Sequence, residues 1–367
     1  MAAGNALDRL LEQLLVQRLG YSPARFPQSA YDLLRAAATT RKTNDLDLVH
    51  GMLAGNHPEL VGSLIDDVTV SHTAIFRHPG QFDHLRQVLP SLHRRAKRPL
   101  MVWSAGCATG EEPYSIAVCA EQAGVPLSIL ATDVSPSAIA QARRGRYKRR
   151  LPGGRKWSDA PKRWDASESH KRMITFEVGS LVGPDPTRGR GPFDIIFCRN
   201  VLIYFDRRSV PRILQDLASH LFPSGSIVVS PADTVLPMPD MLHPDSAVGW
   251  LRLDDEVPPS SLPTRRIEIL PPPRRTEISP IEQAVQLLGA GEFDAAEATL
   301  TKLINADPNR MDCWFLLGET LEQRGERLQA RLAFQRAAAC TGVGAEGPDA
   351  ETLSWAAARR AEALSGS

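Results

Sequence analysis

The sequence predicts an α/β fold, a doubly wound parallel sheet, with helical segments before and after it. From residue 100 onward, short apolar runs alternate with stretches of helical periodicity, which is the pattern of a parallel sheet covered by helices on both faces. The N-terminal part shows helical spacing only, and a stretch rich in proline precedes the C-terminal part. We therefore divide the chain into a helical domain, an α/β domain, a proline-rich linker and a helical module, at residues 1–90, 91–257, 258–279 and 280–367.

The expected elements follow from the spacing of apolar residues. In the first domain, leucines recur at helical intervals from Leu7 to Leu15. Further helices are expected there at 29–38, 45–54, 58–66 and 79–89. In the α/β domain, the runs expected to be strands are LMVW, SILATDV, MITFEV, DIIFC and SIVVS. The helices expected between them are EEPYSIAVCAEQAG, SPSAIAQARRG and RRSVPRILQDLASHLF.

The C-terminal module contains two copies of one pattern, 34 residues apart. The aligned pairs are Gly291 with Gly325, Ala296 with Ala330, Leu300 with Phe334, and Leu303 with Ala337. A helix-turn-helix unit of this length is typical of the tetratricopeptide repeat (TPR). The first copy has Pro280 where the second has Trp314, and residues 353–363 are expected to form a capping helix. A protein or peptide partner is expected for this module.

Composition and charge exclude several classes of protein. The net charge is +1 and no apolar run approaches the ~20 residues that span a bilayer, so neither a nucleic-acid partner nor an integral membrane protein is expected. Charges interrupt the N-terminal helix, unlike a signal peptide, so a cytoplasmic protein is expected. The basic clusters HRRAKR and RRGRYKRR are interpreted as solvated helix ends and loops, with an acidic partner as the alternative. The five cysteines form no CxxC pair, which indicates neither a disulfide framework nor a metal site.

The segment VWSAGCATGEEPYSIA has the pattern of a cofactor-binding turn. A predicted strand leads into a turn from Gly106 to Gly110, and a helix is expected to begin near Glu111. Glycines let a ligand approach the backbone closely, and a helix N-terminus offers free N–H groups. The next strand ends at Asp133, 23 residues after Gly110. Nucleotide-binding folds place an acid at about this distance, where it holds ribose hydroxyls.

S-adenosylmethionine is the cofactor that suits this turn best. The turn after the first predicted strand lacks the dinucleotide pattern GxGxxG, and no Lys-Ser/Thr pair follows it, which argues against NAD and ATP. The amino-acid end of S-adenosylmethionine suits the glycine turn, and Glu112 and Asp133 can accept hydrogen bonds from its ribose. Glu111 and Glu112 also have an alternative explanation, since acids in the first turn stabilise the helix dipole.

Four blocks of the sequence resemble the CheR family of chemotaxis receptor methyltransferases. They are HTAIFRHPGQF, GCATGEEPYSIA, ATDVSPSAIAQARRGRY and FDIIFCRNVLIYFD, in family order and spacing. The resemblance covers roughly residues 10–255. With its C-terminal repeats, the chain is similar to the WspC subgroup, which is linked to surface sensing and biofilm control. The resemblance implies the doubly wound sheet of an S-adenosylmethionine-dependent methyltransferase.

The resemblance also implies roles for individual residues. Arg77, in the T-x-x-F-R block, and Tyr204 are expected to be catalytic, with Tyr204 facing the transferred methyl group. The residues expected to bind the cofactor are Ser71, Thr73, Arg77, Gly106, Gly110, Glu112, Asp133, Ser180, Leu181, Arg199 and Asn200. Ser71 and Ser180 stand where asparagines are usual in the family. Without the resemblance, Tyr204 and Phe205 would be interpreted as packing at the sheet edge.

The reaction that the resemblance implies is methylation of glutamate side chains on the cytoplasmic domain of a chemoreceptor, in chemosensory or surface-sensing signalling. A glutamate has a pKa of about 4.3 and is ionised at neutral pH, so the reaction needs no general base. Arg77 can hold the acceptor carboxylate with its guanidinium fork. No metal is expected, and contact with the membrane is expected only through the receptor.

Two segments depart from the family pattern. Residues 147–173 show no evident set of three strands, although the family has a small β-subdomain there that docks a receptor tail peptide. Any tethering of the receptor is therefore expected at the repeats. Residues 230–240 differ from the Ser-Glu pattern that is common after the fifth strand.

Two other functions stay open at this point. One is a methyltransferase of the same fold that acts on another protein or carboxylate acceptor. The other is a TPR scaffold that only senses the cofactor. The joint presence of Arg77, Glu112, Asp133 and Asn200 disfavours the scaffold, because a degenerate site would be expected to lose some of them.

Overall fold

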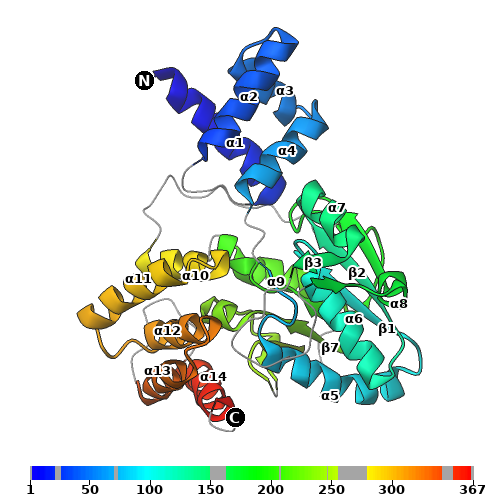
Figure 1. Ribbon diagram of the computed structural model, residues 1–367, viewed down its shortest axis with the longest axis vertical. Coiled ribbons are helices and arrows are strands. Elements are labelled where there is room, and N and C mark those ends of the chain that lie inside the picture. The colour runs from blue at the N-terminus through cyan, green and yellow to red at the C-terminus, as the bar shows by residue number, and fades with distance from the viewer. Residues whose placement is uncertain are drawn as a thin grey trace.

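The computed structural model describes residues 2–20, 26–69, 73–148, 163–205, 208–245, 247–254, 279–340 and 350–364. Figure 1 shows an N-terminal group of helices, a sheet with helices packed on it, and a C-terminal stack of helices beside the sheet. The proline-rich linker, apart from Ser279, lies outside the described residues. None of the helices in the described ranges is long and apolar enough to cross a membrane.

The N-terminal group has an apolar core of its own. Its helices are α1 (Ala2–Leu19), α2 (Gln28–Arg41), α3 (Asp45–Leu53) and α4 (Pro58–Val68). Leucines of α1 at the predicted spacing, Leu11, Leu14 and Leu15, are fully buried in this core, so the predicted helices are confirmed. The next helix, α5 (Pro79–Ala96), extends past residue 90 and packs with the sheet through Phe82 and Leu85.

Within the described residues the main sheet has seven strands, in the order β5-β2-β1-β6-β7-β9-β8. The five predicted strands are confirmed as a parallel set. They are β1 (Leu100–Ala105), β2 (Leu127–Asp133), β5 (Ile174–Val178), β6 (Phe193–Phe197) and β7 (Leu221–Val228). The sheet is mixed rather than wholly parallel, because β9 (Trp250–Leu253) and β8 (Leu242–Pro244) extend one edge in antiparallel orientation. These strands are too short to give a clear alternating pattern in the sequence.

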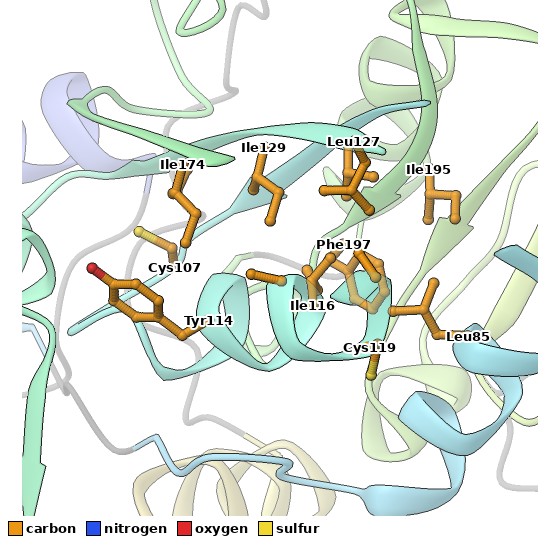
Figure 2. Close-up of a cluster of buried hydrophobic side chains, with 14 of the residues drawn as sticks. Leu85, Cys107, Tyr114, Ile116, Cys119, Leu127, Ile129, Ile174, Ile195 and Phe197 are labelled. Atoms are coloured by element: carbon orange, nitrogen blue, oxygen red, sulfur yellow. The ribbon is translucent and has the colours of Figure 1, made fainter. Parts of the chain in front are cut away.

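Helices cover both faces of the main sheet, which confirms the doubly wound class. On one face, α5 packs beside α6 (Glu111–Ala123), α7 (Pro136–Arg144) and α8 (Glu168–Met173). On the other face lies α9 (Val210–Ser219). Figure 2 shows Leu127, Ile129 and Ile195 of the sheet pointing toward α6, where Ile116 lies.

A small antiparallel sheet follows α7, in the segment where the sequence showed no evident strands. β3 (Arg146–Lys148) pairs with β4 (Arg163–Asp165). The rings of Tyr147 and Trp164, one from each strand, both pack on Tyr114 of α6. Three residues are too few to show an alternating pattern, so these strands could not be predicted. Residues 149–162 lie outside the described residues.

The strand order creates a crevice between the loops after β1 and β6. The neighbours of β1 are β2 on one side and β6 on the other. The chain therefore runs outward from β1 to β2 and β5, and then returns to the opposite side of β1 at β6. In open α/β sheets, ligands bind at such a switch point, outside the carboxyl ends of the strands.

The C-terminal stack packs against the α/β domain. It consists of α10 (Pro280–Ala290), α11 (Phe293–Ala306), α12 (Met311–Gln323), α13 (Arg327–Ala339) and α14 (Ala350–Ala363). Each of these helices packs on the next, and the aligned residues Leu300 and Phe334 are both fully buried. The apolar core of the stack also includes Ile203, Ala232 and Val248 of the α/β domain. The contact between the two parts is therefore a shared core.

Two glycines flank α6 and differ in their surroundings. Gly110 and Gly124 both have positive φ, 96° and 64°, so a side chain strains the backbone at either position. A Cβ on Gly110 would also lie 2.7 Å from the Cβ of Ala142, whereas nothing lies within 4 Å of a Cβ on Gly124. We expect Gly124→Ala to lower the free energy of unfolding by about 1 kcal/mol, and Gly110→Ala to lower it by about 1–3 kcal/mol more. Urea titrations measure both, and equal losses would contradict the steric explanation.

Candidate active site

A cavity lies at the switch point, at the carboxyl ends of β1, β2 and β6. The loops after these strands line it, together with residues of the N-terminal helices and of α10. Ten of the twelve residues predicted for the site line this cavity. They are Thr73, Arg77, Gly106, Glu112, Asp133, Ser180, Leu181, Arg199, Asn200 and Tyr204. Ser71 lies outside the described residues.

The two glycines of the predicted turn have different surroundings. Gly106 lines the cavity, and a Cβ there would lie 2.3 Å from Cγ2 of Val201 in the loop after β6. Its missing side chain therefore lets the two loops of the switch point approach each other. Gly110 is not among the residues that line the cavity. At Gly110, the last residue of the turn, a Cβ would instead meet Ala142 and the hydroxyl of Tyr147.

A buried ion pair joins the two sides of the switch point. Nη1 of Arg199, after β6, donates to Oε2 of Glu112 at the start of α6, at 2.9 Å. The hydroxyl of Ser104 donates to Oε1 of the same carboxylate, at 2.7 Å. Nη2 of Arg199 donates to the backbone carbonyl of Arg77. Both oxygens of Glu112 thus have protein donors, which fixes the side chain that was expected to face the ribose.

Asp133 connects the loops that follow β1 and β2. Its Oδ2 accepts from the backbone N–H of Ala108 at 2.8 Å, and its Oδ1 accepts from the N–H of Ser135 at 2.9 Å. Burial raises the pKa of Asp133 above its ordinary value, although these backbone donors act in the opposite direction. The carboxylate also lines the cavity, so it is held by backbone N–H groups and faces the cavity.

Arg77 lies in a segment with an unusual backbone. The residues on either side of it, Phe76 and His78, have φ of 54° and 58°, in the left-handed region that is costly for residues other than glycine. The side chain of Arg77 is buried and lines the cavity. Burial and the charge of Arg199 lower the pKa of Arg77 to about 10. Arg77 is therefore still cationic at neutral pH.

Asn200 has its backbone held by a buried acid that the sequence analysis did not identify. Asn200 has φ of 57°, and its N–H donates to Oδ2 of Asp233 at 3.0 Å. The same oxygen accepts from the N–H and the hydroxyl of Ser230, at 2.9 Å and 2.7 Å. Ser230 and Asp233 form a capping box, and the Ser-x-x-Asp spacing was a signal that could have identified Asp233.

Tyr204 lies at the end of a short 3₁₀ helix, η1 (Leu202–Tyr204), between the cavity and the C-terminal stack. Burial raises its pKa to about 12, so the hydroxyl is neutral at physiological pH. Gly289 of α10 also lines the cavity. On the N-terminal side, Leu19 and Thr69 complete the wall. Sequence reasoning missed these three residues because their positions depend on contacts between separate parts of the chain.

A turn after β1, an acid at the end of β2 and a buried guanidinium group define a nucleotide-type cofactor site on a doubly wound sheet. The match to a family of proteins agrees with this class. The family described as "CheR methyltransferase, SAM binding domain" matches residues 71–246. Among solved structures, the magnesium protoporphyrin IX methyltransferase ChlM from Synechocystis PCC 6803 with bound SAM aligns at 16% identity, over 41% of this chain and 58% of its own, with a TM-score of 0.26.

Curated relatives cover more of the chain. A probable biofilm formation methyltransferase, WspC, from Pseudomonas aeruginosa is 27% identical over 378 residues, which is 89% of this chain and 89% of the relative. A chemotaxis protein methyltransferase from Vibrio parahaemolyticus is 34% identical over 211 residues, which is 53% of this chain and 76% of the relative. The chain belongs to the CheR methyltransferase family. It is an S-adenosylmethionine-dependent methyltransferase of chemotaxis-type signalling.

Removal of the Asp233 carboxylate tests how the turn at Asn200 is held. In Asp233→Ala, the buried N–H groups of Asn200 and Ser230 lose their acceptor, and we expect the free energy of unfolding to fall by about 2–4 kcal/mol. Calorimetry should also show weaker binding of S-adenosylhomocysteine. The exposed Asp240, substituted in the same way, serves as the control. A loss of stability no larger than that of Asp240→Ala would contradict the role of Asp233.

Proposed function

We propose that this protein methylates glutamate side chains on the cytoplasmic domain of a chemoreceptor, and forms methyl esters in chemosensory or surface-sensing signalling. The observation that carries the proposal is the position of Arg77, which lines the same cavity as the acids Glu112 and Asp133. A buried cation beside a cofactor site suits an anionic acceptor. The relatives named for chemotaxis and for biofilm formation support the signalling role.

The residues around the cavity suit S-adenosylmethionine. Asp133, oriented by backbone N–H groups, and Glu112, oriented by Ser104 and Arg199, can accept hydrogen bonds from ribose hydroxyls. The apolar side chains of Val134 and Leu181 offer a surface for the adenine ring. When bound, S-adenosylmethionine supplies a methyl group on a positively charged sulfur, which a carboxylate oxygen can take in one displacement.

The chain's own residues then mainly bind and orient the acceptor. Arg77, cationic at neutral pH, can hold the acceptor carboxylate through its guanidinium fork while one oxygen stays available to react. Tyr204, neutral below a pKa of about 12, can donate a hydrogen bond but cannot act as a base at neutral pH. Orientation of a carboxylate that is already ionised, with its water removed, contributes several kcal/mol to such a reaction.

For the C-terminal stack we propose the TPR class and a protein or peptide partner. The helical pairs α10–α11 and α12–α13 follow the 34-residue offset of the sequence, and α14 covers the end of the stack by packing on α13. The four-part division of the chain and the roles of individual site residues are parts of this proposal. The receptor domain is the proposed route by which the protein reaches the membrane.

Arg77→Ala tests the proposed anion clamp. We expect turnover to fall about 100-fold or more, because the acceptor is no longer oriented, while calorimetry shows binding of S-adenosylhomocysteine within a few fold of wild type. Arg95→Ala, an exposed arginine on α5, the helix that begins two residues after Arg77, should retain full turnover. The assay uses methyl-labelled S-adenosylmethionine and receptor-containing membranes. Label that mild alkali releases as methanol identifies an ester, whereas alkali-stable label would mean a different acceptor.

The pH dependence of cofactor binding tests Asp133. Burial raises the pKa of this carboxyl above the ordinary aspartate value of 3.8. As the pH is lowered, Asp133 should therefore become half protonated at a pH above 3.8. We therefore expect the affinity for S-adenosylhomocysteine to fall as the pH is lowered, with a midpoint above the ordinary aspartate pKa. Asp133→Asn should bind about tenfold or more weakly at neutral pH and lose this pH dependence. An unchanged pH profile in a folded Asn variant would assign the titration to another group.

A further inference from the structure

The backbone around Arg77 needs external support. Phe76 and His78 both have left-handed φ, and such residues persist only where the surrounding structure holds them. Two of the contacts come from the α/β domain, and a third is local. The N–H of Phe76 donates to the hydroxyl of Ser115 at 2.9 Å, and Arg199 donates to the carbonyl of Arg77. The carbonyl of His78 accepts from the N–H of Gln81 at 3.0 Å.

The side chain of His78 is held by a different part of the chain. Only 3% of His78 is exposed. Its Nδ1 lies 3.1 Å from Nε2 of Gln323 and 3.6 Å from Oε2 of Glu319, both on α12 of the C-terminal stack. Burial and the charges of Arg199, Arg77 and Arg360 lower the pKa of His78 well below its ordinary value. The ring is therefore neutral, and Nδ1 can accept a hydrogen bond from the amide of Gln323.

Further contacts fix α12 and α10 in this position. Arg360 of α14 donates to Glu319 at 3.0 Å and also to Glu322, so the carboxylate beside His78 is itself oriented. On the other side of the cavity, a Cβ on Gly289 of α10 would lie 2.0 Å from Cδ1 of Ile203, in the 3₁₀ helix that ends at Tyr204. The stack therefore contacts the segments of both proposed catalytic residues.

We propose that Gln323 is a positioning residue for methyl transfer: it holds the ring of His78 and thereby the backbone of Arg77. This inference rests on the proposed role of Arg77 as the clamp for the acceptor. It assigns to the C-terminal stack a part in the reaction itself, in addition to any partner that the stack binds. Loss of the contact should affect orientation of the acceptor more than binding of the cofactor.

Gln323→Ala in the full-length protein tests this inference. We expect the turnover number at saturating substrates to fall about tenfold or more, as for other small misplacements of a reacting group. Binding of S-adenosylhomocysteine should stay within about twofold, since Gln323 is not among the residues that line the cavity. The matched control is Gln335→Ala, an exposed glutamine on α13, which should leave both quantities unchanged.

Hydrogen–deuterium exchange gives a second readout that does not depend on the acceptor. Amides of residues 73–82 should exchange faster in Gln323→Ala than in wild type or Gln335→Ala, because a contact that holds the strained segment is lost. His78→Asn should retain more turnover than His78→Ala, since asparagine tolerates the left-handed backbone and can accept from Gln323. Gln323→Glu, which keeps the length of the side chain but removes the donor to Nδ1, provides a second variant with the same expected losses if Gln323→Ala does not fold.

The outcomes separate this inference from the proposed function. Wild-type protein that transfers no methyl group to receptor membranes would contradict the proposed function, and the exchange measurement would still decide whether α12 holds the segment. Unchanged exchange over residues 73–82 in Gln323→Ala would overturn the positioning role. Faster exchange over these residues in a Gln323→Ala protein that keeps the wild-type turnover number would overturn it as well.

Discussion

The buried ion pair between Arg199 and Glu112 is the contact on which the cavity depends. Glu112 begins α6 after the turn of β1, Arg199 follows β6, and the same guanidinium group reaches the carbonyl of Arg77. One side chain thus fixes three segments relative to one another. A buried pair adds little net stability, but loss of one partner leaves an uncompensated charge in the interior. The ion pair therefore fixes how the three segments lie relative to one another more than it adds to stability. A substitution of either partner affects all three segments.

Near this ion pair, two carboxylates accept hydrogen bonds from loop N–H groups that have no partner in the sheet. Beyond the last residues that pair where the chain leaves β1, β2 and β6, N–H groups such as those of Ala108, Ser135 and Asn200 donate to no neighbouring strand, and buried N–H groups without a partner are costly. Asp133 accepts from the loops after β1 and β2, and Asp233 accepts from Asn200 and Ser230. These two carboxylates therefore hold the loops that line the cavity in place, which suits a site that must orient its ligands.

The sequence predicted the parts of the fold that have a local signal. The five parallel strands are apolar runs, and the glycine turn with Asp133 follows from the rule that carboxyl ends of parallel strands meet at one edge. Other features have no such signal. The contact of His78 with Gln323 joins residues 245 positions apart, and Gly289 looks like an ordinary helix residue until α10 is placed against Ile203. These positions are set by packing between units, which periodicity does not report.

The packing between units also explains why the cavity cannot be assigned to the sheet alone. The N-terminal helices contribute Leu19 and Thr69 to its wall, and they are joined to α7 where Ser135 donates to Asp66 at 2.5 Å. The C-terminal stack contributes Gly289 and shares an apolar core with the α/β domain. A displacement of either helical group would therefore change the shape of the cavity without any change in Glu112 or Asp133. Because a small misplacement of reacting groups slows a displacement reaction strongly, contacts far from the chemistry can control it in this fold.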